Sequence, residues 1–150
     1  MHLQVTELFF ELYPLTSALL AMLTAQLIKL IYFYIKEGKI NLKLMFTAGG
    51  MPSSHSAMVM GLTTGVGLKE GWTSSLLCMC VVFSLVVLYD AAGIRQAVGK
   101  QAEILNQMMD DYVQKGEFKA VHLTELLGHT PLEVAAGSLL GIGVAFTLFY

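Results

Sequence analysis

Apolar and polar positions alternate in long blocks along this chain. Apolar runs cover residues 14–35, 54–68, 72–93 and 132–150, with glycine or charged residues at their borders. A helix needs about 20 apolar residues to cross the roughly 30 Å hydrocarbon core of a bilayer. The pattern therefore predicts an all-α polytopic membrane bundle with about four transmembrane helices. We expect residues 1–150 to form a single integral-membrane domain.

Two details of these runs predict how the helices sit. Lys29 lies near one end of the first run, so we expect its ammonium group to extend toward the membrane interface. Gly137 and Gly141 leave one face of the last run without side chains. This small-xxx-small spacing predicts close packing against another helix.

The segment from 94 to 128 has a different pattern, in which apolar residues recur at helical spacing between polar ones. The apolar positions are Ala97, Val98, Ile104, Leu105, Met108, Met109 and Tyr112. The spacing predicts an amphipathic helix that lies on the membrane or on the bundle and ends at Gly116.

Composition agrees with a bilayer as the solvent. Hydrophobic residues make up 55% of the chain, charged residues 13%, and the mean hydropathy is +0.65, which is outside the usual range of soluble domains. A net charge of −2 without a dense Lys/Arg cluster argues against a nucleic-acid partner. Cys78 and Cys80 stand close together in an apolar run, which favours buried free thiols over a disulfide or a metal site. We expect no metal and no cofactor.

The distribution of basic residues predicts the orientation in the cell membrane. They concentrate in the loop that holds Lys36, Lys39 and Lys43 and in the segment 94–128. The positive-inside rule places both in the cytoplasm and both termini outside. The starts of the second and fourth runs would then meet on the cytoplasmic face. The acidic N-terminal residues do not resemble a signal peptide, so we read the chain as mature from its first residue.

The second run begins with an unusually polar stretch, GGMPSSHS at 49–56. Pro52 suits the first turn of a helix, and Ser53 or Ser54 could cap it. Together with the glycines, the hydroxyl groups and nearby Lys43, such a helix start is suited to bind a phosphate. The alternative is a simple helix cap followed by an interfacial histidine.

The last run begins with GHTPLEVAAG, in which His129 and Glu133 are four residues apart. On one helix face, the carboxylate can accept a hydrogen bond from one imidazole nitrogen and leave the other free. This arrangement orients a nucleophile or a base. The alternative is an ordinary surface pair.

A third polar stretch, YDAAGIR, contains the only arginine of the chain, Arg95. A guanidinium group forms two parallel bonds to a phosphate, so Arg95 is a candidate clamp. The alternative is a positive-inside anchor. Asp90 lies inside the third run, so its charge needs a partner such as Arg95 or Lys43. The alternative to a role in the site is a purely structural pairing.

In this order, PSSH, an arginine and GHTPLEVAAG resemble the divergent branch of the type 2 phosphatidic acid phosphatase superfamily, which is related to acid phosphatases and vanadium-dependent haloperoxidases. The similarity runs from about residue 43 to residue 141. Its most specific parts are GGMPSSHS, YDAAGIRQAVGKQAEILN and LGHTPLEVAAGSLLG.

The resemblance implies two groups of site residues. In the phosphate-binding group, Ser53 and Ser54 would hold phosphate oxygens, and Lys43 and Arg95 would neutralise them. In the catalytic group, His129 would attack phosphorus, Glu133 would orient it, and His55 would protonate the leaving alkoxide.

The chain also departs from the superfamily pattern. Ser54 stands in place of a glycine and Glu133 in place of an aspartate, while Arg95 lies 34 residues before His129 instead of close to it. Gly50 occupies the position of an arginine in the first motif, where it could only support the site.

The resemblance implies a metal-independent lipid phosphatase that works through a phosphohistidine. With a cytoplasmic site, phosphatidylglycerophosphate or phosphatidic acid would suit it better than an external polyprenyl diphosphate. Two other classes of function remain open, a catalytically silent lipid-phosphate binder and a four-helix membrane scaffold or transport subunit. We expect lipid partners and consider a homodimer.

Overall fold

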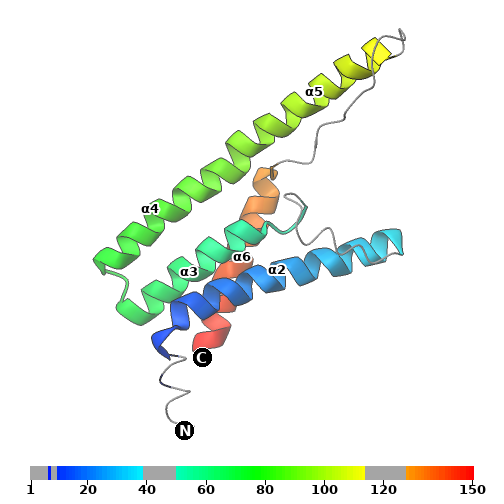
Figure 1. The fold of residues 1–150 in the computed structure, drawn as a ribbon. Coiled ribbons are helices and arrows are strands. Elements are labelled where there is room, and N and C mark those ends of the chain that lie inside the picture. Colours follow the sequence, from blue (N-terminus) through cyan, green and yellow to red (C-terminus); the bar gives the residue numbers. More distant parts are fainter. Residues whose placement is uncertain (1–6, 8–9, 39–49, 114–127) are drawn as a thin grey trace.

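The computed structural model describes residues 7, 10–38, 50–113 and 128–150, and every regular element among them is a helix (Figure 1). The elements are α2 (Tyr13–Glu37), α3 (Ser54–Glu70), α4 (Ser75–Tyr89), the π-helix η2 (Asp90–Ile94), α5 (Arg95–Val113) and α6 (Pro131–Phe149). The predicted all-α membrane bundle is confirmed, and each of the four apolar runs forms a helix.

Helix α3 lies at the centre of the bundle, in contact with α2, α4 and α6 (Figure 1). Among the described residues, three helical stretches are long and apolar enough to cross a membrane: Tyr13–Lys36, Ser75–Asp110 and Pro131–Phe149. Helix α3 has 17 residues and is richer in Ser, Thr and Gly. Because its neighbours shield it, it needs fewer apolar side chains than a helix that faces lipid.

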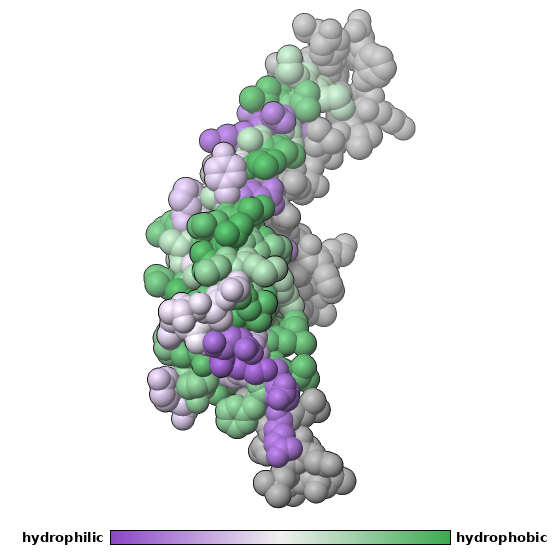
Figure 2. Space-filling view, turned by 90° about the vertical axis from the view of Figure 1, so that its left-hand side faces the viewer, coloured by the Kyte–Doolittle hydropathy of each residue, from purple (hydrophilic) through white to green (hydrophobic). Residues whose placement is uncertain are grey.

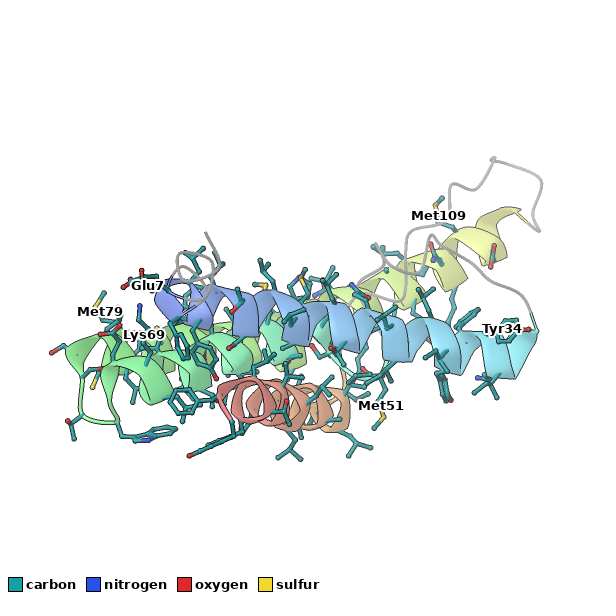
Figure 3. All side chains as sticks on the ribbon, turned by 90° about the horizontal axis from the view of Figure 1, so that it is seen from below. Glu7, Tyr34, Met51, Lys69, Met79 and Met109 are labelled. Carbon is teal, nitrogen blue, oxygen red and sulfur yellow. The ribbon has the colours of Figure 1, made fainter. Side chains whose placement is uncertain are left out.

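Helix α2 runs antiparallel to α3 and α6, which run parallel to each other, so the helix ends gather at two ends of the bundle. The hydroxyl of Tyr13 donates to the carbonyl of Ala145, and its ring packs edge-to-face on Phe149 at 5.4 Å. Lys69 donates to the carbonyl of Glu11 at 2.8 Å. The start of α2 therefore lies beside the ends of α3 and α6, and the starts of α3 and α6 lie toward the opposite end, where Figure 3 labels Met51.

A stripe of buried residues on α2 faces α3. It repeats every fourth residue and consists of Tyr13, Ser17, Ala21, Ala25 and Lys29. The small side chains allow close approach: a Cβ on Gly61 of α3 would lie 3.0 Å from the Cβ of Ala21. The expectation that Lys29 reaches the membrane interface is wrong, because it belongs to this stripe and is buried.

Helix α6 packs on α3 through the two glycines singled out in the sequence. A Cβ on Gly137 would collide with the carbonyl oxygen of Ser53, and one on Gly141 with that of Ala57. The predicted small-xxx-small contact is confirmed. It brings the main chain of α6 directly against the start of α3.

Hydroxyl groups join α3 to α4. Thr63 and Ser84 share a hydrogen bond of 2.7 Å, and Ser84 also donates to the carbonyl of Val59 at 3.2 Å. Cys78 and Cys80 of α4 are free thiols, as expected. The expectation that both are buried is wrong, because Cys78 faces outward and Cys80 is only partly covered.

Helix α4 continues through η2 into α5, so one long helix projects beyond the bundle (Figure 1). The predicted amphipathic helix exists, but it extends α4 and does not fold back on the bundle. Large apolar side chains of α5 are exposed, with Ile104 and Met108 at 57% and 60%. The predicted end at Gly116 lies outside the described residues.

Apolar side chains dominate the outside of the bundle. Large hydrophobic residues are exposed along α2, α4 and α6, including Ile35, Val86 and Leu139. Figure 2 shows hydrophobic surface over the bundle and hydrophilic residues gathered toward the lower end and along the projecting helix. In water such a surface would drive aggregation, whereas in a bilayer it faces lipid.

Candidate active site

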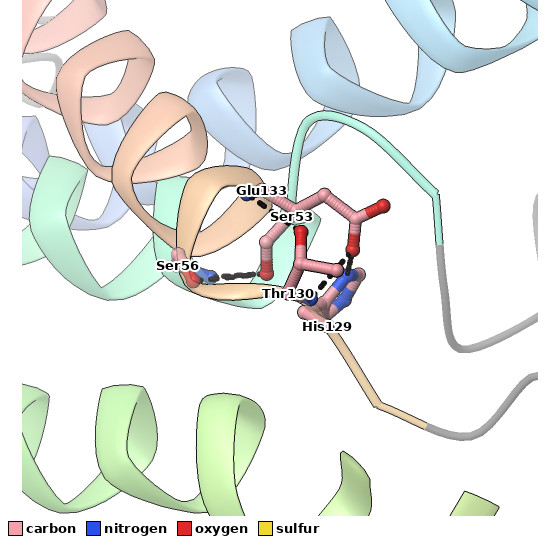
Figure 4. A network of polar contacts seen from close by, with 5 residues as sticks. All are labelled: Ser53, Ser56, His129, Thr130 and Glu133. Atoms are coloured by element: carbon pink, nitrogen blue, oxygen red, sulfur yellow. Dashed lines mark hydrogen bonds and ion pairs between the residues drawn. The ribbon is translucent and has the colours of Figure 1, made fainter.

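The starts of α3 and α6 are joined by a main-chain hydrogen bond. The amide of Ser53 donates to the carbonyl of Glu133 at 3.1 Å. Ser53 is the N-cap of α3: its Oγ accepts from the amide of Ser56 at 3.3 Å and from the Ser56 hydroxyl at 2.9 Å (Figure 4). Of the two cap candidates, Ser53 is therefore the one used, and Pro52 precedes the cap and is not in the first turn.

A capping box fixes the start of α6. The Thr130 hydroxyl accepts from the amide of Glu133 at 3.3 Å, and the Glu133 carboxylate accepts from the amide of Thr130 at 2.9 Å (Figure 4). Pro131 occupies the first turn, where its missing N–H has no helical partner to lose. These contacts hold the Glu133 carboxylate at the mouth of the helix.

His129 lies just before this cap and is 3% exposed. Its amide donates to the carbonyl of Ala91 in η2 at 3.1 Å, and its Nδ1 lies 3.2 Å from Oε2 of Glu133 (Figure 4). The alternative of a surface pair is wrong, because the imidazole is buried. All three polar stretches of the sequence thus meet here, joined by two main-chain hydrogen bonds.

The Glu133 carboxylate sets the tautomer of His129. An ionised carboxylate is only an acceptor, so Nδ1 carries the proton that lies between them. Nε2 then holds the lone pair. The geometry is that of an oriented nucleophile or base.

Electrostatics favour the neutral form of this imidazole. Burial lowers the pKa of His129 below its ordinary value of 6.5. The hydrogen bond and charge of Glu133 raise the pKa, and the positive charges of Lys29 and His55 lower it. Lys29 on α2 and His55 on α3 are therefore close enough for their charges to act on His129.

The second residue of α3, His55, is exposed at the same end of the bundle. Its neighbour Ser54 is 4% exposed, and its Oγ accepts a hydrogen bond of 3.5 Å from Nε2 of Gln26 on α2. The PSSH stretch therefore presents an exposed imidazole on one side and a buried hydroxyl on the side of α2.

Two of the remaining predicted residues lie where α4 continues into α5, and a third, Gly50, precedes α3. Arg95 is the first residue of α5, one helical turn after Ala91, and Asp90 is the first residue of η2. Gly50 has a φ of +81°, a left-handed conformation that favours glycine. Lys43 and the side chain of Arg95 lie outside the described residues, so their roles stay predictions.

Two residues of this site were missed in the sequence, Lys29 and Gln26. Hydropathy alone does not tell whether a lysine near a helix end faces lipid headgroups or the bundle interior. The available signal was the small residue at every fourth position before it, since Ser17, Ala21 and Ala25 predict a packed face that ends at Lys29.

The fold and the site define a class: an all-helical membrane protein with a buried His–Glu pair at the meeting point of two helix starts. Residues 10–144 match the model of the Divergent PAP2 family, and the chain belongs to that family. It is 39% identical over 149 residues to an uncharacterized membrane protein, YuiD, of Bacillus subtilis (strain 168), a match that covers 92% of this chain and 94% of that protein. No solved structure matches the chain. The resemblance noted in the sequence is confirmed at the level of the family.

Proposed function

We propose that this protein is a membrane lipid-phosphate phosphatase that hydrolyses a phosphomonoester through a phosphohistidine on His129, without a metal ion. The observation that carries the proposal is the hydrogen bond from Ser53 to Glu133, because it joins the PSSH stretch to the His129–Glu133 pair. Two helix starts at one point also direct the positive ends of two helix dipoles toward the same space, which favours a phosphate there.

In the first step, Nε2 of neutral His129 attacks phosphorus as the bond to the ester oxygen breaks. His55 donates a proton to the leaving alkoxide, and the alcohol departs. Glu133 stabilises the positive charge that develops on the His129 ring. The product is an N-phosphorylated histidine.

In the second step, water attacks the phosphohistidine and the P–N bond breaks. His55, now neutral, takes a proton from the water. Inorganic phosphate leaves, and both histidines return to their starting states. Ser53, Ser54, Lys43 and Arg95 are the proposed ligands of the phosphoryl oxygens, and such groups supply the charge stabilisation that phosphoryl transfer requires.

The proposed substrate is a lipid phosphomonoester such as phosphatidic acid or phosphatidylglycerophosphate. The site belongs to a membrane bundle whose outer surface is apolar, so a substrate held in the same bilayer can reach it by lateral diffusion. The choice between these lipids and a polyprenyl diphosphate depends on the proposed cytoplasmic orientation of the loops.

Phosphate release from these three lipids and from a soluble phosphomonoester tests the proposal. The purified protein is assayed with EDTA present, and wild type is compared with His129→Ala and with Ser84→Ala, which alters a buried polar side chain between α3 and α4. We expect His129→Ala to lose several orders of magnitude in rate and Ser84→Ala to stay active.

The same assay separates the other functional classes. A silent binder would bind the lipid phosphate, as measured by filter retention or by calorimetry, without releasing inorganic phosphate. A scaffold would neither bind nor release it. Release that persists in His129→Ala would refute the phosphohistidine step.

A further inference from the structure

Among the described residues, Lys29 is the buried charged side chain to which the proposed mechanism gives no role. It is 8% exposed, and its Nζ has no hydrogen-bond partner among the described residues. A buried ammonium group without a partner is strongly unfavourable, and ionisable residues inside membrane helices therefore mark functional positions.

The position of Lys29 is set by the packing of α2 on α3. It is the last residue of the buried stripe that begins at Tyr13, and the small residues between them hold α2 close to α3. One turn earlier, Gln26 donates to Oγ of Ser54 at the start of α3. Lys29 therefore lies on the face of α2 that packs against α3, one turn beyond the residue that contacts the start of α3.

The charge of Lys29 acts on both members of the His–Glu pair. It interacts with the charges of Glu133 and His129. Glu133 does not neutralise it through direct contact: Oε2 of Glu133 already accepts from the Thr130 amide and faces Nδ1 of His129. Within the described part of the chain, Lys29 forms no ion pair. Among the described residues, the ammonium group therefore has no anion to balance its burial.

We propose that Nζ of Lys29 binds a phosphoryl oxygen of the substrate from inside the bundle. This deepens the proposed function, since it assigns a cation to the phosphate site in addition to the loop lysine and the arginine. An ammonium group offers three donors on a flexible stem, which suits the tetrahedral oxygens of a phosphate. The ligand chemistry is a phosphate group, either free or carried by a lipid.

The test compares Lys29→Met and Lys29→Arg with wild type and with Lys36→Met, the matched control from the exposed last turn of the same helix. Calorimetry with the detergent-solubilised protein measures binding of inorganic phosphate and, separately, of phosphatidic acid in mixed micelles, with phosphatidylcholine as the uncharged-headgroup control. Thermal unfolding of the ligand-free protein is measured in parallel.

For Lys29→Met we expect phosphate and phosphatidic acid to bind about tenfold to a hundredfold more weakly, the usual worth of one charge-assisted hydrogen bond. Lys29→Arg should retain part of the binding. The ligand-free Lys29→Met protein should be at least as stable as wild type, because an unpaired buried charge is replaced by an apolar side chain of similar length. Lys36→Met should match wild type in every measurement. A defect with phosphatidic acid alone would identify the lipid as the source of the phosphate.

Where the wild type turns over a lipid, a second readout follows. Removing the charge of Lys29 raises the pKa of His129, so the acid limb of the pH–rate profile should move to higher pH. The other charges that act on His129, those of Glu133 and His55, are unchanged in this variant. A lysine with a purely structural role in packing would not produce weaker phosphate binding together with this shift.

The outcomes distinguish this proposal from the proposed function. If the wild type releases no phosphate from any lipid but Lys29→Met still binds phosphate more weakly, the phosphatase reading fails and Lys29 remains a ligand. If Lys29→Met binds both ligands like wild type, the proposal is overturned. It is also overturned if Lys29→Met is less stable than wild type or cannot be folded, because the lysine would then be a paired structural group.

Discussion

Adding one methyl group at Gly137 tests whether the contact between α6 and α3 builds the active site. The new Cβ would collide with the carbonyl oxygen of Ser53 and lie 3.1 Å from its nitrogen and its carbonyl carbon. These are main-chain atoms, so they cannot rotate away. The same residue donates the hydrogen bond to Glu133 that joins the two helix starts. Gly137→Ala should therefore separate α6 from α3 at the site.

The same helix supplies a matched control. A Cβ on Gly143 would meet nothing within 4 Å, so Gly143→Ala changes only the helix propensity, by about 1 kcal/mol in favour of the helix. Gly137→Ala has the same gain but adds an overpacking cost of about 1–3 kcal/mol. The free energies of unfolding of the two variants should differ by that cost. We expect a value near its upper limit, because the colliding atoms belong to the main chain.

Unfolding in mixed micelles, followed by circular dichroism as the denaturing detergent is increased, measures this difference in free energy. Phosphate release under native conditions measures the damage to the site. We expect Gly137→Ala to be less stable and much less active than wild type, and Gly143→Ala to be at least as stable and fully active. Equal stability and equal activity of the two variants would refute the described contact.

Three further predictions concern the chemistry of the site. Glu133→Gln should lower the rate on the order of 10³–10⁴-fold, because an amide N–H directed at Nδ1 of His129 forces the tautomer whose Nε2 is protonated and cannot attack. The exposed control Glu70→Gln should be fully active, and a mild effect of Glu133→Gln in rate assays would contradict this role. The rate should fall toward low pH with a midpoint below 6.5, because burial lowers the pKa of His129 and only its neutral form attacks. It should also fall at high pH, where His55 has lost the proton that it donates. A flat pH–rate profile, or an acid limb at or above 6.5, would count against the mechanism. His55→Ala should cost about 10²–10⁴-fold with alkyl phosphates and far less with p-nitrophenyl phosphate, whose leaving group needs no proton; equal losses with both substrates would exclude His55 as the general acid.

The elements were predictable because their signals are local. Apolar runs predicted the helices, the two serines of PSSH marked the start of α3, and the spacing of Gly137 and Gly141 predicted the contact between α6 and α3. Each of these depends on neighbouring residues along the chain or on one helix face.

The surroundings of Lys29 and His129 could not be predicted in the same way. Burial of Lys29 depends on which face of α2 packs against α3, and burial of His129 depends on its bond to Ala91 in a π-helical turn. No pattern in YDAAGIR marks that turn, because a π-helix differs from an α-helix only in that its hydrogen bonds span one more residue, and it is stabilised by its tertiary contacts. Both features arise from pairs of segments far apart in the sequence.

The main-chain bonds at the site also determine which variants can test it. Ser53 reaches Glu133, and His129 reaches Ala91, through amide and carbonyl groups that any non-proline residue retains. Replacing the His129 ring or the Glu133 carboxylate therefore removes reactive atoms and leaves the links between α3, α6 and η2 in place. It follows that His129→Ala should fold and still bind phosphate, so its loss of rate would report chemistry. Gly137→Ala, by contrast, disturbs the links themselves and should reduce binding and rate together.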